Sequence, residues 1–510
     1  MLAKVLSAAV VGLNGTPIEV EVDIASQGLP SFTIVGLPDK AVEESKERVR
    51  SAIKNSGAEF PAKRITVNLA PADLPKEGPS YDLPIALGIL IASGQIKGDF
   101  SNSLFTGELS LDGKLRQTNG ILPQIIMAKE RKIKNAFVPF ENSNEAAIIK
   151  EVEVYPIKNL LSLAKYLTSE EKILPIKHSS LNEYLKNDSF DFDMNEVQGQ
   201  EQAKRAMEIA AAGGHNILLK GPPGAGKTLI ARTLPSILPR LSLEEALEVT
   251  KIYSISGLLD KDTIITKRQF RSPHHTTSYI GLIGGGVIPK PGEISLAHRG
   301  VLFLDEFPEF PRHVLEALRQ PMEDGFVTIS RAQGRITFPS KFMLVAAQNP
   351  CPCGYLGDKT HACRCSASQI ARYQKRISGP MLDRIDIHLE VPAVKVEKLT
   401  STDGIKRETS VQIRRRVQRA KDIQLNRFKN IKITSNSEMT NKDIKKFCGL
   451  SKDCVSLLKM AVARMNLSAR SYHRIIKLSR TIADLEGEKD IKPSHIAESL
   501  QYRPKVEITY

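Results

Sequence analysis

A strand that runs directly into a glycine-rich turn constrains this chain more than any other stretch. Residues 216–228 read NILLKGPPGAGKT, with the spacing G-x-x-x-x-G-K-T counted from Gly221. Glycines in such a turn let backbone N–H groups approach an anion, because side chains would block the approach or the dihedrals. The helix expected next presents its positive N-terminus at the same point. The stretch therefore predicts a triphosphate cradle between a buried strand and a helix.

Two side chains complete the predicted cradle. Lys227 supplies a point charge for the phosphates, and the Thr228 hydroxyl is expected on a magnesium ion. The residues expected to bind the nucleotide are Gly221, Pro222, Pro223, Gly224, Ala225, Gly226, Lys227 and Thr228.

A second nucleotide signature is the run GVLFLDE at residues 300–306. Its apolar residues predict a buried central strand with two carboxylates at its C-terminal end, where open α/β sheets bind ligands. Asp305 is expected to hold magnesium, and Glu306 to orient and deprotonate the attacking water. Together with the glycine-rich turn, these residues predict an enzyme that hydrolyses ATP with Mg²⁺.

Three further polar residues resemble parts of AAA+ ATPases. Asn349 follows a predicted strand at 342–347 and is similar to a sensor residue, although a turn former before a proline is the alternative. Arg384, in GPMLDRID, resembles an arginine finger that would reach a neighbouring subunit's nucleotide, against a surface salt bridge. Arg376 is a second candidate for that role. Arg470 lies in a segment similar to the second sensor helix, with Arg474 one turn further on.

Two insertions interrupt this module. Residues 271–277 and 284–295 are too rich in glycine and proline for a helix and predict a mobile loop with Lys290 near its tip. Residues 326–338 alternate on both sides of Gln333-Gly334, which predicts a β-hairpin with Arg331 and Arg335 at its tip. Lys290, Arg331 and Arg335 are the candidate DNA contacts, against a ligand-free lid and an ordinary solvated hairpin.

Four cysteines form a C-x-C-x9-C-x-C pattern: Cys351, Cys353, Cys363 and Cys365. Four thiolates so close in sequence suit a tetrahedral Zn²⁺ site, although the spacing departs from the usual C-x2-C knuckle. Four reduced thiols without metal are the alternative.

The first 168 residues predict an α+β domain. Strands are expected at 18–24, 31–35 and 64–69, and helices at 40–55 and 83–92. Residues 75–80 and 106–109 resemble motifs of the Lon-type peptidase domain, yet Leu122 stands where the family's lysine base is expected. Ser80 then fits a helix N-cap rather than a nucleophile.

Charge and hydropathy bound the partners. The chain of 510 residues holds 72 Lys plus Arg against 57 Asp plus Glu, a formal charge of +15, which favours polyanions such as nucleic acid. No apolar run approaches the roughly 20 residues of a membrane helix, so no membrane contact and a cytoplasmic location are expected.

The predicted fold is multi-domain. An α+β, Lon-protease-like domain occupies 1–168 and a linker 169–190. An α/β AAA+ P-loop core with a parallel sheet, a helix-2-type insert and a β-hairpin occupies 191–395, followed by a basic all-α lid at 396–510. The lid's cationic run at 409–433 is typical of a solvated helix face.

Long strings across the chain resemble the ComM/YifB family of magnesium-chelatase-like AAA+ proteins. They include NLAPADLPKEG (68–78), FRSPHHTTS (270–278), PGEISLAHRGVLFLDEFPEF (291–310) and NPCPCG (349–354). The resemblance implies a homo-hexameric ATPase with a degenerate Lon-like domain. It further implies a helicase that drives branch migration of branched or single-stranded DNA in homologous recombination and natural transformation, alongside recombination proteins. A magnesium-chelatase motor subunit and an ATP-dependent serine protease are the alternatives.

Overall fold

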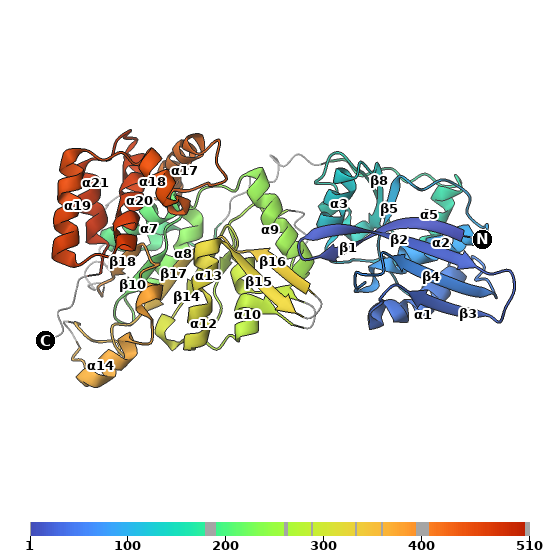
Figure 1. Cartoon of the computed structure of the whole chain (residues 1–510), viewed down its shortest axis with the longest axis horizontal. Helices are drawn as coiled ribbons and strands as arrows, with labels where there is room; N and C mark the ends of the chain where they lie inside the picture. Colours follow the sequence, from blue (N-terminus) through green and yellow to red (C-terminus); the bar gives the residue numbers. More distant parts are fainter. Residues whose placement is uncertain are drawn as a thin grey trace. The chain divides into compact units, whose positions relative to one another are not determined.

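The computed structural model describes residues 2–178, 190–259, 264–286, 289–331, 334–358, 361–393 and 407–504, with the side chain of Arg331 outside that description. The chain forms two compact units (Figure 1). The first comprises Met1–Asn187 and Leu243–Ile265, and the second Asp188–Ser242 and Thr266–Tyr510. No helix in the described part has the length and apolar character that crossing a membrane would require.

The first unit is built on a seven-stranded sheet with the order β3-β4-β2-β1-β5-β8-β9. β1 (Leu2–Val11) and β2 (Asn14–Ile24) form an antiparallel hairpin whose alternate side chains are buried, so that one face of the hairpin enters the core. α2 (Asp82–Ala92) packs on both strands. The other elements include β3 (Ser31–Val35), α1 (Lys40–Asn55), β4 (Arg64–Ala70), β5 (Ser103–Phe105), β6 (Glu108–Leu109), β7 (Leu115–Arg116), α3 (Ile121–Glu130), β8 (Asn135–Pro139), α4 (Ser143–Ala146), β9 (Glu153–Ile157) and α5 (Leu160–Leu167).

Helix α9 (Leu243–Ser256) also belongs to the first unit, although it comes from the middle of the chain. It packs on α3, and the Ser254 hydroxyl donates to Glu145 Oε1 at 2.5 Å. The backbone N–H of Gly120 donates to the Ser254 carbonyl at 3.2 Å. Burial raises the pKa of Glu145, and its hydrogen bonds oppose that shift. These bonds satisfy a buried carboxyl group, which would otherwise destabilise the fold.

The second unit contains a five-stranded parallel sheet with the order β11-β14-β17-β10-β18. Its central strands are short and fully apolar, as expected where helices cover both faces. The strands are β10 (Ile217–Lys220), β11 (Phe270–Arg271), β14 (Val301–Leu304), β17 (Met343–Gln348) and β18 (Ile387–Glu390). Nearby helices are α7 (Glu201–Gly213), α8 (Lys227–Ile237), α12 (Arg312–Ala317), α13 (Arg319–Asp324), α14 (Ala367–Gln374) and α15 (Gly379–Leu382).

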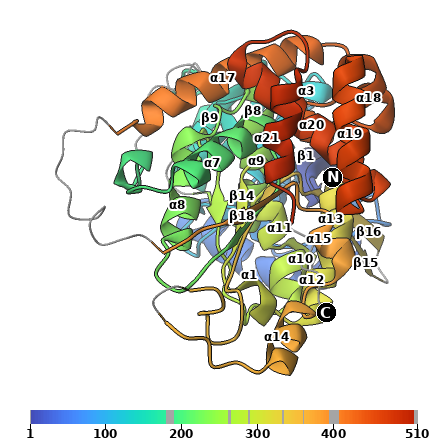
Figure 2. The same cartoon turned by 90° about the vertical axis from the view of Figure 1, so that its left-hand side faces the viewer.

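The C-terminal part of this unit is helical, as predicted (Figure 2). α17 packs on α7, α8 and α20, and α20 packs on α21. Phe428, Leu458, Ile475 and Ile496 lie in a separate small core of these helices. The helices are α17 (Ser410–Arg427), α18 (Asn441–Phe447), α19 (Lys452–Met465), α20 (Ala469–Glu486) and α21 (Pro493–Gln501). The mixed α/β architecture with a parallel sheet and a helical C-terminal region is of the AAA+ type.

Three local predictions need correction. Ser80 lies inside a 3-10 turn (Pro79–Tyr81), and the N-cap of α2 is Tyr81, without a side-chain cap. The segment 271–295 is more than a loop, since β12 (Gly284–Gly285) pairs with β13 (Lys290–Pro291) between the short helices α10 (Tyr279–Ile283) and α11 (Glu293–Leu296). Residues 287–288 lie outside the described part.

The predicted hairpin is present, but its register differs. β15 (Phe326–Arg331) pairs with β16 (Gly334–Pro339), and Arg331 is opposite Gly334. The connection therefore falls on residues 332 and 333, which lie outside the described part, and Gly334 belongs to a strand. The alternation is real, since Val327, Ile329 and Phe338 are buried while Arg335 is exposed.

Candidate functional site

The glycine-rich turn lies between β10 and α8, as its sequence predicts. Gly224 and Gly226 have φ of +73° and +83°, backbone conformations that glycine adopts at little cost. Lys227 begins α8, and its Nζ lies 2.8 Å from the carbonyl oxygens of Gly221 and Pro222. Burial lowers the pKa of Lys227, and the nearby Asp305 carboxylate opposes this shift.

Asn349 and Asp305 reach this turn from the ends of two neighbouring strands. Asn349 follows β17, and its Oδ1 accepts a hydrogen bond from Lys227 Nζ at 3.1 Å. Asp305 follows β14, and its Oδ2 accepts from the Thr228 hydroxyl at 2.8 Å. Parallel strands with a common polarity bring their carboxyl ends together, so residues far apart in sequence meet at one edge.

Glu306 has an unusual backbone and an unexpected partner. Its φ of +50° and ψ of 44° are uncommon for a residue other than glycine. Its side chain is 55% exposed, and Oε2 lies 3.1 Å from Nδ1 of His275. The ring of His274 lies against that of His275. Sequence reasoning missed the His275–Glu306 contact, because histidines 31 residues before an acidic strand end give no local signal of the pairing.

The predicted arginine finger is tied within its own chain. Arg384 is buried, with Nη1 donating to the Pro380 carbonyl at 2.6 Å and Nη2 at 2.5 Å from Glu323 Oε1. Arg470, half exposed, places Nη2 3.2 Å from the same Glu323 oxygen. Glu323 therefore joins two arginines that the sequence assigned to the nucleotide, and no local motif marks it.

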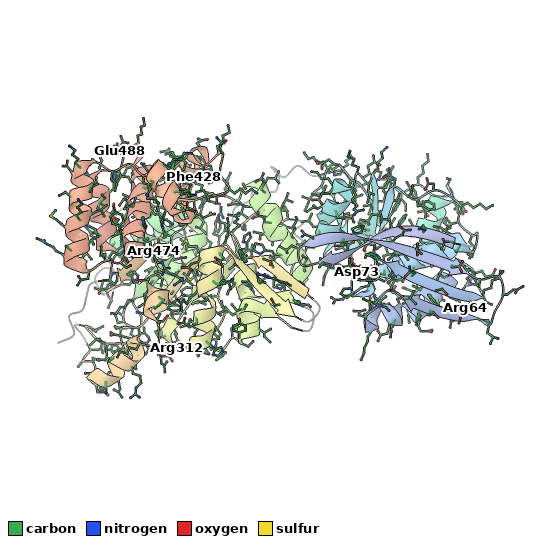
Figure 3. All side chains as sticks on the ribbon, viewed as in Figure 1. Arg64, Asp73, Arg312, Phe428, Arg474 and Glu488 are labelled. Atoms are coloured by element: carbon green, nitrogen blue, oxygen red, sulfur yellow. The ribbon has the colours of Figure 1, made fainter. Side chains whose placement is uncertain are left out.

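The two alternative arginines have partners of their own. Arg474 pairs with the buried carboxylate of Asp386, and Figure 3 labels its position among the lid side chains. Arg376 pairs with Glu309. It lines a cleft formed by residues 308–312 and 368–376, which also carries the cations Arg312, Arg372 and Lys375.

The candidate DNA contacts differ in what can be said of them. Lys290 in β13 and Arg335 in β16 are exposed. Arg331 ends β15, but its side chain lies outside the described part.

The cationic run of the lid is less solvated than its composition suggests. Arg416 in α17 pairs with Glu208 of α7 and Glu408, and these two carboxylates raise its pKa. Arg427 pairs with the buried Asp484, and Lys421 donates to the Thr434 carbonyl at 2.6 Å. Much of this charge therefore holds the lid together.

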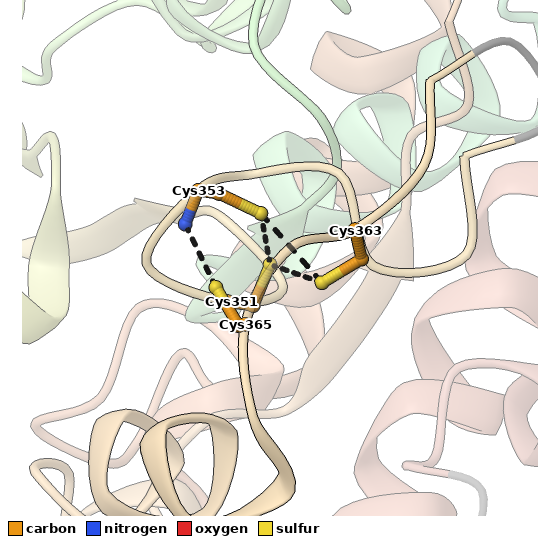
Figure 4. A group of neighbouring side chains, drawn as sticks. All are labelled: Cys351, Cys353, Cys363 and Cys365. Carbon is orange, nitrogen blue, oxygen red and sulfur yellow. Dashed lines mark hydrogen bonds between the residues drawn. The ribbon is translucent and has the colours of Figure 1, made fainter.

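The four cysteines converge as their spacing predicts. Each offers one sulfur, and these sulfurs all lie within 4.8 Å of one another (Figure 4). Backbone N–H groups of Tyr355 and Arg364 lower the pKa of Cys353 to about 6. Cys448 and Cys454 are buried elsewhere, in the core of the lid.

The motif at Ser80 has no lysine contributed by the turn before α3. Leu122 is fully buried in α3, where its backbone N–H donates to Glu145. Lys76, in the motif itself, is buried and donates to the Pro71 carbonyl. Asp82 at the start of α2 pairs with Arg48 at 2.7 Å, and its pKa is raised to about 6 mainly by burial.

Comparison with known proteins matches three parts of the chain to family models. "Magnesium chelatase, subunit ChlI" matches residues 193–399, "Subunit ChlI of Mg-chelatase" residues 20–142, and "Magnesium chelatase, subunit ChlI C-terminal" residues 407–503. The chain is 46% identical to competence protein ComM of Haemophilus influenzae over 517 residues, covering 99% of this chain and 98% of that protein. It belongs to the ComM/YifB family.

Other relatives fit this ComM/YifB assignment. The Escherichia coli protein YifB is 43% identical over 507 residues, covering 98% of this chain and 97% of YifB. Lon protease 2 of Bacillus subtilis is 30% identical over 161 residues, which are 28% of each chain. The family is thus shown over the full length, while the likeness to Lon proteases is partial.

Proposed function

We propose that this protein is an ATP-driven DNA motor of the ComM type, which hydrolyses ATP in a homo-hexameric ring to drive branch migration during recombination and natural transformation. The observation that carries the ATPase part is the convergence of Lys227, Thr228, Asp305, Glu306 and Asn349 at one edge of the parallel sheet. The relative named for competence supports the DNA part.

Magnesium fits the donors at this edge. The Thr228 hydroxyl and the Asp305 carboxylate lie 2.8 Å apart and are oxygen ligands of the kind Mg²⁺ prefers. When bound, the ion would neutralise charge on the phosphate oxygens. Lys227 leaves its carbonyl partners for phosphate, Asn349 orients the terminal phosphate or the water, and Glu306 accepts the proton of that water.

Assembly completes the site in this proposal. Arg384 leaves Glu323 and neutralises transition-state charge at a neighbouring subunit's nucleotide, while Arg470 acts on the nucleotide of its own subunit. Glu323 holds both arginines in the single chain, so hydrolysis depends on a ring in which those ion pairs are exchanged.

The DNA contact rests on the hairpin and on the loop of Lys290. The formal charge of +15 favours a polyanion, and Lys290 and Arg335 are exposed. The lid helix α17 contributes less than its sequence suggested, because Arg416 and Arg427 are engaged in ion pairs.

For the remaining parts, we propose a degenerate Lon-like domain at 1–168, a linker at 169–190, a core at 191–395 and a lid at 396–510. The partial likeness to a Lon protease supports the first of these. The buried Leu122 at the place of the catalytic lysine argues against peptidase activity. We place the protein in the cytoplasm with recombination proteins, since its proposed substrate is DNA.

A motor subunit of a magnesium-chelatase-like complex is the second candidate. The family models, which cover the core and the lid, carry the chelatase name. This reading shares the ATP site and differs in needing no DNA.

ATP hydrolysis with branched, single-stranded or no DNA tests the proposed function. We expect a branched substrate to stimulate hydrolysis, and the wild type to move a labelled junction while the Glu306→Gln form does not. Normal hydrolysis without DNA stimulation or junction movement would refute the DNA motor and leave the chelatase-like motor. Absence of hydrolysis in every condition would refute both.

Removing the hairpin charges should uncouple DNA from hydrolysis. In the double variant Arg331→Ala and Arg335→Ala, we expect DNA-free hydrolysis to stay normal while the DNA concentration for half-maximal stimulation rises about tenfold. A Lys452→Ala and Lys459→Ala variant removes the same charge from exposed positions of α19 and serves as the control. Equal loss in both variants would indicate a non-specific charge effect.

Releasing Glu306 from His275 should raise basal hydrolysis. Since a partly exposed ion pair is worth at most about 1 kcal/mol, we expect His275→Ala to accelerate DNA-free hydrolysis roughly two- to fivefold. His274→Ala is the matched control, because His274 contacts His275 and Thr276. A slower His275→Ala enzyme would mean that His275 supports Glu306 in catalysis.

A further inference from the structure

The four-cysteine cluster has the dimensions of a tetrahedral metal site. The sulfur of Cys351 lies 3.4 Å from that of Cys353 and 3.7 Å from that of Cys363, and the last two are 3.6 Å apart. Four sulfurs at a Zn–S distance of about 2.3 Å would be separated by about 3.8 Å. The cluster lies close to that geometry (Figure 4).

Backbone around the cluster is arranged for thiolates. The N–H of Gly354 donates to the Cys351 carbonyl at 3.0 Å and closes a tight turn, and the N–H of Cys353 points to Cys365 Sγ at 3.4 Å. Cys351 is fully buried. Two C-x-C arms thus face each other, although each arm has one residue fewer than the usual zinc knuckle.

The cluster is continuous with the candidate ATP site. Cys351 follows Asn349 by two residues, and Asn349 contacts Lys227. Gly354 has φ of +87°, and a Cβ at this residue would lie 2.6 Å from two ring carbons of Pro223 in the glycine-rich turn. The cysteine turn therefore packs directly on the phosphate-binding turn.

We propose that Cys351, Cys353, Cys363 and Cys365 bind one Zn²⁺ ion, and that this ion clamps the turn 349–354 against the phosphate-binding turn and so positions Asn349. The metal site stands on the cysteine geometry alone. The positioning role rests on the proposed ATPase function. A soft, borderline cation suits four thiolates, which would exclude Mg²⁺ from this site.

Metal content of the full-length protein tests the site without reference to ATP. Purified under reducing conditions, it should contain about one zinc per chain, and cobalt exchanged into the site should show the intense thiolate charge-transfer and d–d absorption of a tetrahedral sulfur site. Cys353→Ser and Cys363→Ser should abolish the cobalt spectrum, and Cys448→Ala, outside the cluster, should keep it.

Two results would overturn the metal site. One is wild-type protein that takes up neither zinc nor cobalt after reduction and reconstitution. The other is a cobalt spectrum that survives in both cluster variants. Because the wild type alone gives the first readout, misfolding of a cysteine variant cannot obscure it.

The positioning role is tested by a glycine that leaves every thiol in place. Gly354→Ala should keep its zinc but disturb the packing on Pro223, so that ATP binds roughly tenfold more weakly while ADP affinity changes less, as expected if Asn349 serves the terminal phosphate. Gly357→Ala is the matched control, since Gly357 also has positive φ (+80°) but nothing within 4 Å of an added Cβ.

Titrations with fluorescent ATP and ADP analogues separate the outcomes. Equal loss of ATP and ADP affinity in Gly354→Ala would reduce the cysteine turn to a structural support and overturn the positioning role. Zinc-loaded wild type that binds no nucleotide would overturn the proposed function and leave the metal site standing.

Discussion

Glu306→Gln should bind ATP normally and fail to hydrolyse it. The substitution keeps the shape and hydrogen-bonding reach of the side chain but removes the base that accepts a proton from water. General bases contribute about 10²- to 10⁴-fold, so we expect the rate of phosphate release to fall by that factor. Lys227, Thr228, Asp305 and Asn349 remain in place, so ATP affinity should change less than about threefold.

Single-turnover phosphate release and equilibrium ATP binding measure the two quantities separately. Glu309→Gln is the control, since Glu309 lies one turn further on and pairs with Arg376. If Glu306→Gln retains more than about a tenth of the wild-type rate, Glu306 is not the base. A parallel loss of ATP affinity would indicate damage to the phosphate-binding turn.

Arg384→Ala should be the second severe variant, with hydrolysis falling by about 10³-fold or more, as for other arginine fingers. Arg376→Ala should have a much smaller effect, because Arg376 lies on a separate cleft with Glu309. The structure adds a complication, since Arg384 is buried and paired with Glu323 within its own chain. A loss of activity alone would fit a structural arginine as well.

Mixing two inactive variants distinguishes these roles. A ring of Lys227→Ala and Arg384→Ala subunits contains interfaces where an intact Lys227 meets a neighbour's intact Arg384, so hydrolysis should partly return. Rings mixed from Lys227→Ala and the double variant should stay inactive, because no interface has both residues. No recovery in freely exchanging subunits would show that Arg384 acts within its own chain or only supports the fold.

Much of the nucleotide site could be predicted because it is written in short patterns. Apolar runs set β10, β14 and β17, and the residues that follow each run reach one edge once the strands are parallel. The predicted strand at 31–35 and helix at 40–55 in the first unit match β3 and α1 end to end. Local periodicity is sufficient where one face of an element is buried.

Contacts between distant segments could not be predicted. Glu323 meets Arg384 and Arg470, and His275 meets Glu306, without any sequence pattern that links the partners. The lid's cationic run was interpreted as a solvated face because composition does not show that Glu208 lies opposite Arg416. The hairpin turn moved by one residue because strand pairing, rather than the glycine itself, decided the register.

Helix α9 affects how this protein can be dissected. The first unit takes residues 1–187 and 243–265, so the backbone passes between the units three times rather than through a single linker. Deleting everything before residue 190 would remove α3, the partner of α9, and leave Ser254 without the Glu145 carboxylate. Such a truncated protein would expose an apolar helix face and tend to aggregate. Removing α9 together with the first 187 residues, and joining Ser242 to Thr266 with a short flexible linker, respects the boundary that the chain itself draws.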